Sequence, residues 1–372
     1  MLKEAFKFMW YDKAKMFGIL FGIILSVFLI GQQLGICFSL LGGTISLAEN
    51  NKKYLWVVSD KSQQVSDLPL IDMRISRQLM TVAGVLRVNT MIVGAASAKF
   101  KDNTKTPLTL IGTQSPQHIG GPWNFVKGRL GDLQQEGAII LDEYDPIISK
   151  KLKIGDYFEL NGNRAFLSGN TQGAKGLGVA YGFTTVERVR KLCKIPTTKA
   201  SAFLVEIEPN YTNQQVADNI NKELRGIKAR DGQVYTDESL KYFALNSGIV
   251  ASFGLLVVFA IITGFAIVGL TMFSAVNDRL KDYGTLKAIG GTNSIIRQLI
   301  LWQATIYSVV GFCIAYVLLR GFVNVTKKSL NIQITPYLIL FLIGVTLFIA
   351  MLGSLFAMRK ITKMEPAEVF RT

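Results

Sequence analysis

Four long apolar runs set the narrowest limits on how this chain can fold. They cover residues 16–41, 249–274, 299–319 and 336–357. Each is long enough for a helix that crosses the hydrocarbon core of a membrane, which takes about 20 residues. None carries Asp, Glu, Lys, Arg or His in its middle, so no proton relay or ion pathway is indicated. We therefore predict four transmembrane helices, with small-residue pairs such as Gly18/Gly22 and Ala260/Gly264 at their contacts.

The segment between the first and second runs, residues 42–248, is polar and mixes strand and helix patterns. The predicted strands are 54–59, 86–99, 106–112, 137–141, 157–160 and 202–208, and the predicted helices are 70–82 and 212–224. Asn161-Gly162 predicts a hairpin turn. We expect a further helix to begin after Asp237 and to continue without a break into the second span. The predicted fold class is an integral membrane α-helical protein with a large α+β domain between its first and second helices.

Residues 168–182 are rich in glycine and predict a mobile loop. Their spacing does not match the phosphate-binding pattern G-x-x-x-x-G-K-[ST]. The segment also follows a hairpin strand, whereas a phosphate-binding loop opens a helix. The sequence therefore predicts no nucleotide site here.

The residue types in the chain offer little support for enzymatic or metal chemistry. No cysteine pair has metal-ligand spacing among Cys37, Cys193 and Cys313. The single histidine, His118, excludes most histidine-based triads and sites with several histidines. The acid cluster at residues 142–145 lies beside Pro146 and is typical of a solvated turn. We expect no catalytic residue, metal site or cofactor in this chain.

The charge distribution predicts how the chain is oriented in a membrane. Lys and Arg number 41 against 26 Asp and Glu, but they are spread thinly, which favours contact with anionic lipid over nucleic acid. Segments 1–15, 275–298 and 358–372 hold four Lys or Arg each, and loop 320–335 holds three. The positive-inside rule then places both termini and 275–298 in the cytoplasm, and 42–248 outside. An exported domain without disulfides suits a bacterial periplasm, so we expect a multi-pass inner-membrane protein.

Two short segments beside the spans have amphipathic patterns. Residues 1–15 predict a basic interfacial helix that precedes the first span. Residues 276–291 suit a helix lying across the membrane surface, although an ordinary solvated loop is the alternative. Its apolar residues recur at spacings of three and form one stripe, made of Leu280, Tyr283, Leu286 and Ile289. Gly290-Gly291 marks the expected end of this helix.

Two motifs make the chain similar to a known family. The segment after the second run resembles R-x-x-E-[IY]-G-x-x-K-A-[LI]-G, matched by Arg279, Asp282, Tyr283, Gly284, Lys287, Ala288, Ile289 and Gly290. The tail resembles R-[KR]-x-x-x-[ML]-x-P-x-[ED]-x-[LF]-R, matched by Arg359, Lys360, Met364, Pro366, Glu368, Phe370 and Arg371. With the order of spans and polar domain, these motifs resemble the MacB/FtsX-type (type VII) permeases of ABC transporters, especially the separate permeases of the DevC kind. Asp282 stands where glutamate is commoner in that family.

The resemblance implies a non-catalytic permease that forms a homodimer and works with a separate ABC ATPase. That ATPase would bind the ATP and magnesium. Segment 275–298 would be the coupling helix, with contact residues Arg279, Leu280, Asp282, Tyr283, Gly284, Leu286, Lys287 and Gly290. Leu280, Tyr283 and Leu286 would be its buried contacts. A second candidate site is the tail motif, represented by Arg359, Lys360, Pro366, Phe370 and Arg371.

The same resemblance implies that ATP-driven movement of the second span is transmitted to the external domain. The size of residues 42–248 favours export of an amphiphile, such as a glycolipid, peptide or drug, with a periplasmic adaptor and an outer-membrane channel. One alternative is an FtsX-like signalling module that controls a cell-wall hydrolase, and another is a lipoprotein-extracting permease. A membrane-anchored enzyme is opposed by the missing acid–base constellation.

Overall fold

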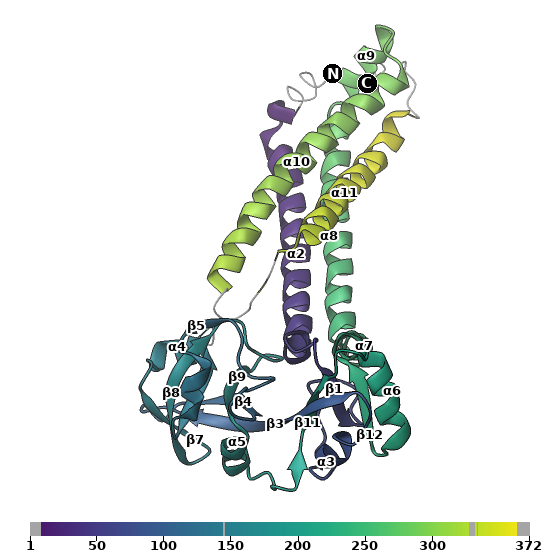
Figure 1. Ribbon diagram of the computed structural model, residues 1–372. Coiled ribbons are helices and arrows are strands. Elements are labelled where there is room, and N and C mark those ends of the chain that lie inside the picture. Colours follow the sequence, from purple (N-terminus) through teal and green to yellow (C-terminus); the bar gives the residue numbers. More distant parts are fainter. Residues whose placement is uncertain (1–8, 144–145, 327–331, 333, 363–372) are drawn as a thin grey trace. The chain divides into compact units, whose positions relative to one another are not determined.

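The structure, a computed structural model, describes residues 9–143, 146–326, 332 and 334–362 and divides into two units (Figure 1). Within the described residues, unit 1 comprises the chain up to Phe38, the stretch 249–326 and the residues from Ile332 onward. Unit 2 comprises Ser39–Gly248. Unit 1 is helical, and unit 2 is built on a mixed sheet.

Unit 1 holds the helices that are long and apolar enough to cross a membrane, except that the last turns of α2, from Ser39 onward, belong to unit 2. In the described part of the chain these are α2 (Lys13–Glu49), α8 (Ile249–Asn277), α10 (Asn293–Thr326) and α11 (Pro336–Thr362). A short helix, α9 (Leu280–Ala288), joins α8 to α10. The predicted fold class is confirmed. Of the predicted interfacial helix, residues 9–11 are helical, Asp12 interrupts the helix and residues 13–15 begin α2, while residues 1–8 lie outside the described residues.

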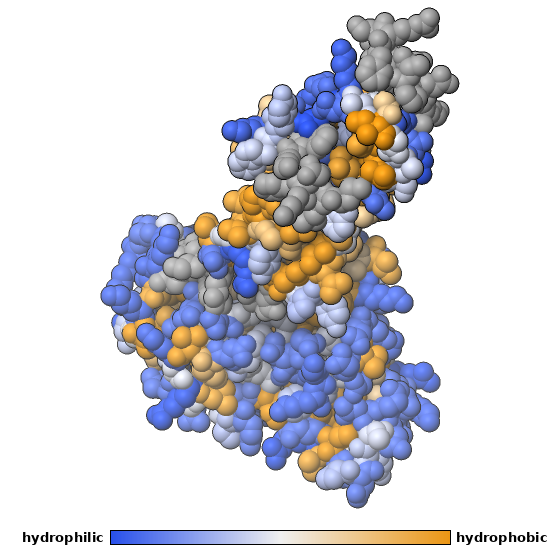
Figure 2. Space-filling view, turned by 90° about the horizontal axis from the view of Figure 1, so that it is seen from above, coloured by the Kyte–Doolittle hydropathy of each residue, from blue (hydrophilic) through white to orange (hydrophobic). Residues whose placement is uncertain are grey.

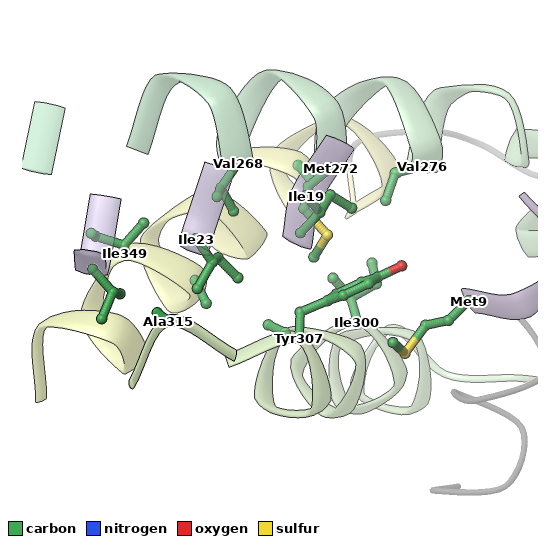
Figure 3. Packing of buried hydrophobic residues seen from close by; sticks show 14 of the residues in the cluster. Met9, Ile19, Ile23, Val268, Met272, Val276, Ile300, Tyr307, Ala315 and Ile349 are labelled. Carbon is green, nitrogen blue, oxygen red and sulfur yellow. The ribbon is translucent and has the colours of Figure 1, made fainter. Parts of the chain in front are cut away.

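The long helices pack through a continuous apolar core in which small residues allow close approach. A Cβ atom on Gly22 of α2 would lie 2.7 Å from Ile267 of α8, and one on Gly311 of α10 would lie 2.6 Å from Ile23. Figure 3 shows Ile19 and Ile23 of α2 among side chains from α8, α10 and α11. Helix association in lipid depends on such packing because the lipid tails are as apolar as the side chains.

The outward faces of these helices are also apolar. Leu255 and Phe259 of α8 are 57% and 56% exposed, and Val317 of α10 is 68% exposed. Figure 2 shows the contrast between the orange surface of the helices and the largely blue surface of unit 2. An apolar exterior over helices whose backbone bonds are satisfied internally is what a lipid environment requires.

Unit 2 contains a ten-stranded sheet in the order β12-β1-β11-β3-β4-β9-β6-β8-β5, with β7 pairing β3 and β8. Its described strands are β1 (Leu55–Ser59), β3 (Val85–Lys99), β4 (Lys105–Thr113), β5 (Phe125–Lys127), β6 (Ala138–Asp142), β7 (Tyr157–Leu160), β8 (Asn163–Thr171), β9 (Ala180–Thr185), β11 (Ala202–Ile207) and β12 (Ile227–Asp231). A separate pair joins β2 (Ile71–Asp72) to β10 (Lys199–Ala200). The pairs β4–β9 and β6–β8 are parallel, and the other strand pairs are antiparallel.

Helices cover the sheet and complete the cores of unit 2. They are α3 (Ile75–Leu79), the 3-10 helix η1 (Leu130–Gln134), α4 (Pro146–Lys151), α5 (Val186–Cys193), α6 (Asn213–Glu223) and α7 (Gly232–Asn246). The six predicted strands and the helix at 212–224 are confirmed. Thr212 accepts a hydrogen bond from the Gln215 backbone, and the Gln215 side chain bonds the Thr212 backbone in return, so α6 starts with a capping box. Asn161 and Gly162 have φ of 46° and 81° and turn the β7–β8 hairpin as predicted.

The predicted helix at 70–82 is wrong over most of its length. Ile71 and Asp72 form a strand pair, and only Ile75–Leu79 is helical. The carboxylate of Asp72 accepts hydrogen bonds from the backbone and the guanidinium of Arg74, at 2.9 Å and 3.0–3.1 Å. This local bonding favours a turn and competes with a helix at these residues.

The predicted unbroken helix leading into the second span is also wrong. Helix α7 starts earlier than expected because the carboxylate of Asp231 caps the backbone N–H groups of Gln233 and Val234. It ends at Asn246, and α8 begins at Ile249. Gly248 has φ +69°, in the left-handed region that ends helices, so the helical conformation is interrupted there.

The glycine-rich segment 168–182 is more ordered than the prediction of a mobile loop. Its first residues belong to β8 and its last to β9. Between them, the backbone N–H of Ala174 donates to the buried carboxylate of Asp142 at 2.6 Å, and Ser46 Oγ of α2 donates to the carbonyl of Lys175 at 2.6 Å. The prediction of a solvated acid turn is therefore wrong for Asp142, which anchors this segment.

Tyr235 of α7 makes the stability of unit 2 sensitive to alkaline pH. Its side chain is fully buried, its hydroxyl lies 2.9 Å from Ser62 Oγ, and burial raises its pKa to about 12. The unfolded chain releases this proton near about pH 10 and the folded chain does not, so stability is complete below about pH 10 and falls as pH rises toward 12. We expect a slope of at most about 1.4 kcal/mol per pH unit from this group. Thermal melts of the full chain in detergent from pH 8 to 11 would show it, and the slope should be shallower in Tyr235→Phe; equal slopes would contradict this assignment.

Candidate functional site

The segment between α8 and α10 is a short helix with a defined end. After Ile289, the backbone N–H of Gly290 donates to the carbonyl of Lys287 at 3.0 Å, and that of Gly291 donates to the carbonyl of Leu286 at 2.8 Å. Gly290 has φ +100°. These two bonds and the left-handed glycine form a Schellman motif, which satisfies the last carbonyls of α9. The helix therefore ends where the sequence indicated.

The inward face of α9 packs against the chain's own helices. Tyr283 is 3% exposed, Gly284 is buried, and Leu280 and Leu286 contact the bundle core. Burial raises the pKa of the Tyr283 hydroxyl to about 12. Tyr283 thus holds α9 on the bundle.

The opposite face of α9 is polar and open. We use the term outer face of α9 for its exposed residues, which are Lys281, Asp282, Thr285, Ala288, Ile289 and Gly290. Ile289 is 80% exposed, which makes it an apolar side chain on an otherwise polar surface. The exposed surface continues into α10 through Asn293, Ser294 and Arg297.

The structure places the predicted contact residues on different sides of α9. The four residues of the apolar stripe do not share one buried face, because Leu280, Tyr283 and Leu286 pack inward while Ile289 is exposed. Of the three residues predicted as buried contacts, Tyr283 is therefore covered by the chain itself, and Leu280 and Leu286 are half-buried. Of the other predicted residues, Asp282 and Gly290 are exposed, Arg279 and Lys287 are half-buried, and Gly284 is buried.

Sequence reasoning overlooked the residues that make up most of the open surface. Lys281, Thr285 and Ala288 are exposed, but they do not belong to the apolar stripe. They recur at spacings of three and four, so the complementary face of the same helical pattern is the signal that identifies them. An apolar stripe on a short helix indicates which face is buried, and the exposed residues lie opposite.

The second predicted site lies largely beyond the described residues. Arg359 and Lys360 lie in the last turns of α11, and their side chains are not described. Pro366, Phe370 and Arg371 lie outside the described residues. The role of this tail motif stays a prediction.

Within the described part of the chain, no group of three or more His, Cys, Asp and Glu side chains could hold a metal ion. His118 is buried in unit 2, where its Nδ1 lies 3.1 Å from Thr113 Oγ1. Burial lowers the pKa of His118, which favours the neutral ring. Its surroundings are those of a core residue.

Comparison with known proteins places α9 inside a conserved type of domain. Residues 254–366 match the family described as FtsX-like permease C-terminal, a stretch that contains α9 entirely. The chain is also 22% identical over 357 residues to "Putative hemin transport system permease protein HrtB" of Staphylococcus haemolyticus (strain JCSC1435), with 93% of each chain covered. Residues 254–366 thus form an FtsX-like permease domain, and the chain resembles an ABC permease over 93% of its length. Membership of this family implies an ATPase partner for the permease.

Two solved structures are similar to part of this FtsX-like permease. The extracellular domain of the noncanonic ABC-type transporter YknZ from Gram-positive bacteria has a TM-score of 0.35 and 14% identity, covering 48% of this chain and 98% of that domain. The periplasmic region of MacB from Actinobacillus actinomycetemcomitans has a TM-score of 0.39 and 10% identity, covering 50% of this chain and 92% of that region.

Proposed function

We propose that this permease couples ATP hydrolysis by a separate ATPase to movement of unit 2, with the outer face of α9 as the docking surface. The observation that carries the proposal is the division of α9 into a face fixed by buried Tyr283 and an open face with exposed Ile289. Ile289 would enter an apolar pocket of the ATPase, as a small number of apolar anchors dominate binding energy at most interfaces. Lys281 and Asp282 would set register and partner choice more than affinity.

In this proposal the termini and α9 are cytoplasmic and unit 2 lies on the other side of a bacterial inner membrane. The ATP and magnesium belong to the ATPase, and a second copy of the permease completes a homodimer. The positive-inside distribution of Lys and Arg supports this orientation. The sequence has no G-x-x-x-x-G-K-[ST] motif, which supports hydrolysis in another chain.

We propose α2 as the element that transmits movement into unit 2. It is unbroken over 37 residues, and its last turns bury Leu47 and Ala48 in a core of unit 2. Ser46 bonds the glycine-rich segment, and a Cβ on Gly43 would lie 2.7 Å from the carbonyl oxygen of Gly176. The path through α8 is interrupted at Gly248, which would serve as a pivot.

The substrate we propose is an amphiphile exported with a periplasmic adaptor and an outer-membrane channel. Glycolipids, peptides and drugs remain in this class, and the name of the Staphylococcus haemolyticus relative adds hemin, which is also amphiphilic. The alternatives are control of a cell-wall hydrolase and extraction of lipoproteins. Co-purification of the tagged permease from its own host distinguishes them, because an adaptor in the complex supports export and a hydrolase supports signalling.

The docking surface is tested by Ile289→Asp. We expect at least about tenfold less ATPase per permease after affinity purification, because a charge in an apolar pocket removes an anchor contact. The ATPase is identified as a co-purifying chain that carries a G-x-x-x-x-G-K-[ST] motif and hydrolyses ATP. Val325→Asp is the matched control, since Val325 is 84% exposed at the far end of α10. Equal ATPase recovery with Ile289→Asp and Val325→Asp would exclude this docking surface.

A further inference from the structure

A cluster of charged side chains joins two parts of the chain that are far apart in sequence. Lys15, in the first turn of α2, forms an ion pair with Asp278, which lies between α8 and α9. Its Nζ also lies 3.4 Å from Asp12 Oδ2, a second ion pair. The same Nζ donates a hydrogen bond to the carbonyl oxygen of Ser274 at 3.4 Å. The Lys15 side chain is 19% exposed, so one half-enclosed cation meets three oxygen groups from two separate stretches of unit 1.

Asp12 and Tyr11 strengthen the connection. Asp12 Oδ1 accepts a hydrogen bond from the backbone N–H of Lys15 at 3.2 Å, as an N-cap residue does. Burial on its own would raise the pKa of Asp12, but its hydrogen bonds with Lys15 lower it below the usual value. The guanidinium of Arg279 lies 5.0 Å from the centre of the Tyr11 ring, which is cation–π distance. Lys15 at the start of α2 therefore contacts Asp278, and Tyr11 just before α2 contacts Arg279.

Beside these contacts is a small polar cavity of about 20 Å³, large enough for one water molecule. Met9, Arg279, Tyr283, Gln303 and Tyr307 contribute to its lining. Figure 3 shows Tyr307 of α10 pointing into the space between Met9 and Val276. The N-terminal residues, α8, α9 and α10 thus converge at one place.

The position of these contacts in the chain gives them a specific consequence. Asn277 ends α8, Arg279 is the N-cap residue of α9, and Asp278 is the residue between them. No side-chain hydrogen bond caps α9 at Arg279. The contacts to Asp278 and Arg279 therefore restrain the turn that sets the direction of α9.

We propose that Lys15 is a positioning residue that fixes the turn between α8 and α9 and so presents the outer face of α9 to the ATPase. This role rests on the docking function proposed above. Exposed ion pairs contribute little to stability, and Asp278 is 58% exposed, so the expected effect is on the geometry of α9 more than on folding.

The test is a charge exchange in the full-length permease. Lys15→Asp places three carboxylates together, and the double variant Lys15→Asp/Asp278→Lys restores one cation among two carboxylates. Spin labels replace Phe17 of α2 and Lys281 of α9, both exposed, in a chain whose Cys37, Cys193 and Cys313 are changed to serine. We expect the distance distribution in lipid nanodiscs to widen in Lys15→Asp, to narrow again in the double variant, and to be unaltered in Lys15→Arg.

The functional readout uses the unlabelled permease and its co-purified ATPase. In Lys15→Asp we expect a roughly fivefold or greater rise in the ATPase concentration that gives half-maximal permease-dependent hydrolysis, at an unchanged maximal rate. The double variant should return this half-maximal concentration to the value of the unmodified permease. An unaltered distance distribution in Lys15→Asp overturns the positioning role. The other contradicting outcome combines both readouts. If the distance distribution widens in Lys15→Asp and recovers in the double variant, but the half-maximal ATPase concentration is the same in every variant, including Ile289→Asp, the docking function is overturned and with it the role of Lys15.

Discussion

Truncation of Trp56 to alanine is expected to lower the free energy of unfolding of unit 2 by about 3–5 kcal/mol. Trp56 lies in β1, is fully buried, and belongs to the core that also contains Leu47 and Ala48 from the end of α2. Its ring centre lies 5.6 Å from that of Tyr235, and its Nε1 donates to the carbonyl of Asn51 at 3.3 Å. Removing the indole leaves a cavity and removes one of the two hydrogen bonds to the Asn51 carbonyl, at the point where α2 is anchored.

Thermal unfolding of the full chain in detergent, followed by circular dichroism, measures this loss. For a domain of this size we expect the melting temperature of unit 2 to fall by roughly 6–20 °C. Trp302→Ala is the matched control, because Trp302 is 43% exposed on α10. A Trp56→Ala melt within a degree or so of that control would show that this core contributes little to stability.

Replacement of Gly264 with leucine is expected to disrupt the contact between α2 and α8. A Cβ atom at Gly264 would lie 2.2 Å from Ser26 Oγ and 2.7 Å from Ser26 Cβ. Ser26 cannot rotate away without loss, because it is buried and its hydroxyl donates to the carbonyl of Gly22 at 2.8 Å. The helices must separate, and overpacking of this kind costs about 3 kcal/mol.

Gly254→Leu is the control for this change, since no atom lies within 4 Å of a Cβ at Gly254 in the same helix. Heating in detergent followed by size-exclusion chromatography gives the temperature at which half of each variant is lost. That temperature should fall for Gly264→Leu and stay near the unmodified value for Gly254→Leu. Similar loss temperatures for the two variants would mean that α2 and α8 tolerate a wider spacing than the structure indicates.

These expectations bear on how movement passes through the permease. The Trp56 core holds the end of α2 in unit 2, and the Gly264 contact holds the first half of α2 against α8. If α2 transmits movement as proposed, both variants should also reduce permease-dependent ATP hydrolysis at temperatures where the chain is folded. The controls Trp302→Ala and Gly254→Leu should retain it.

Much of the architecture follows from local sequence patterns. The four apolar runs determined the membrane helices because a span needs an uninterrupted apolar length, which is a property of the sequence itself. Thr212 with Gln215 determined the start of α6, and Asn161-Gly162 the β7–β8 turn. Gly290-Gly291 determined the end of α9. In each case the deciding interaction joins residues within a few positions of one another.

The tertiary structure decided which side chains are buried or paired, because this depends on contacts between segments that are far apart in sequence. Sequence periodicity found the apolar stripe of α9, but the helix bundle determined that Tyr283 is buried in the chain and that Ile289 is exposed. Asp142 became an anchor because β6 places its carboxylate beside Ala174, and Lys15 meets Asp278 across 263 positions of sequence. A local pattern specifies that a helix or strand has an apolar or charged face. Which surface meets that face depends on contacts that form only when distant segments pack together.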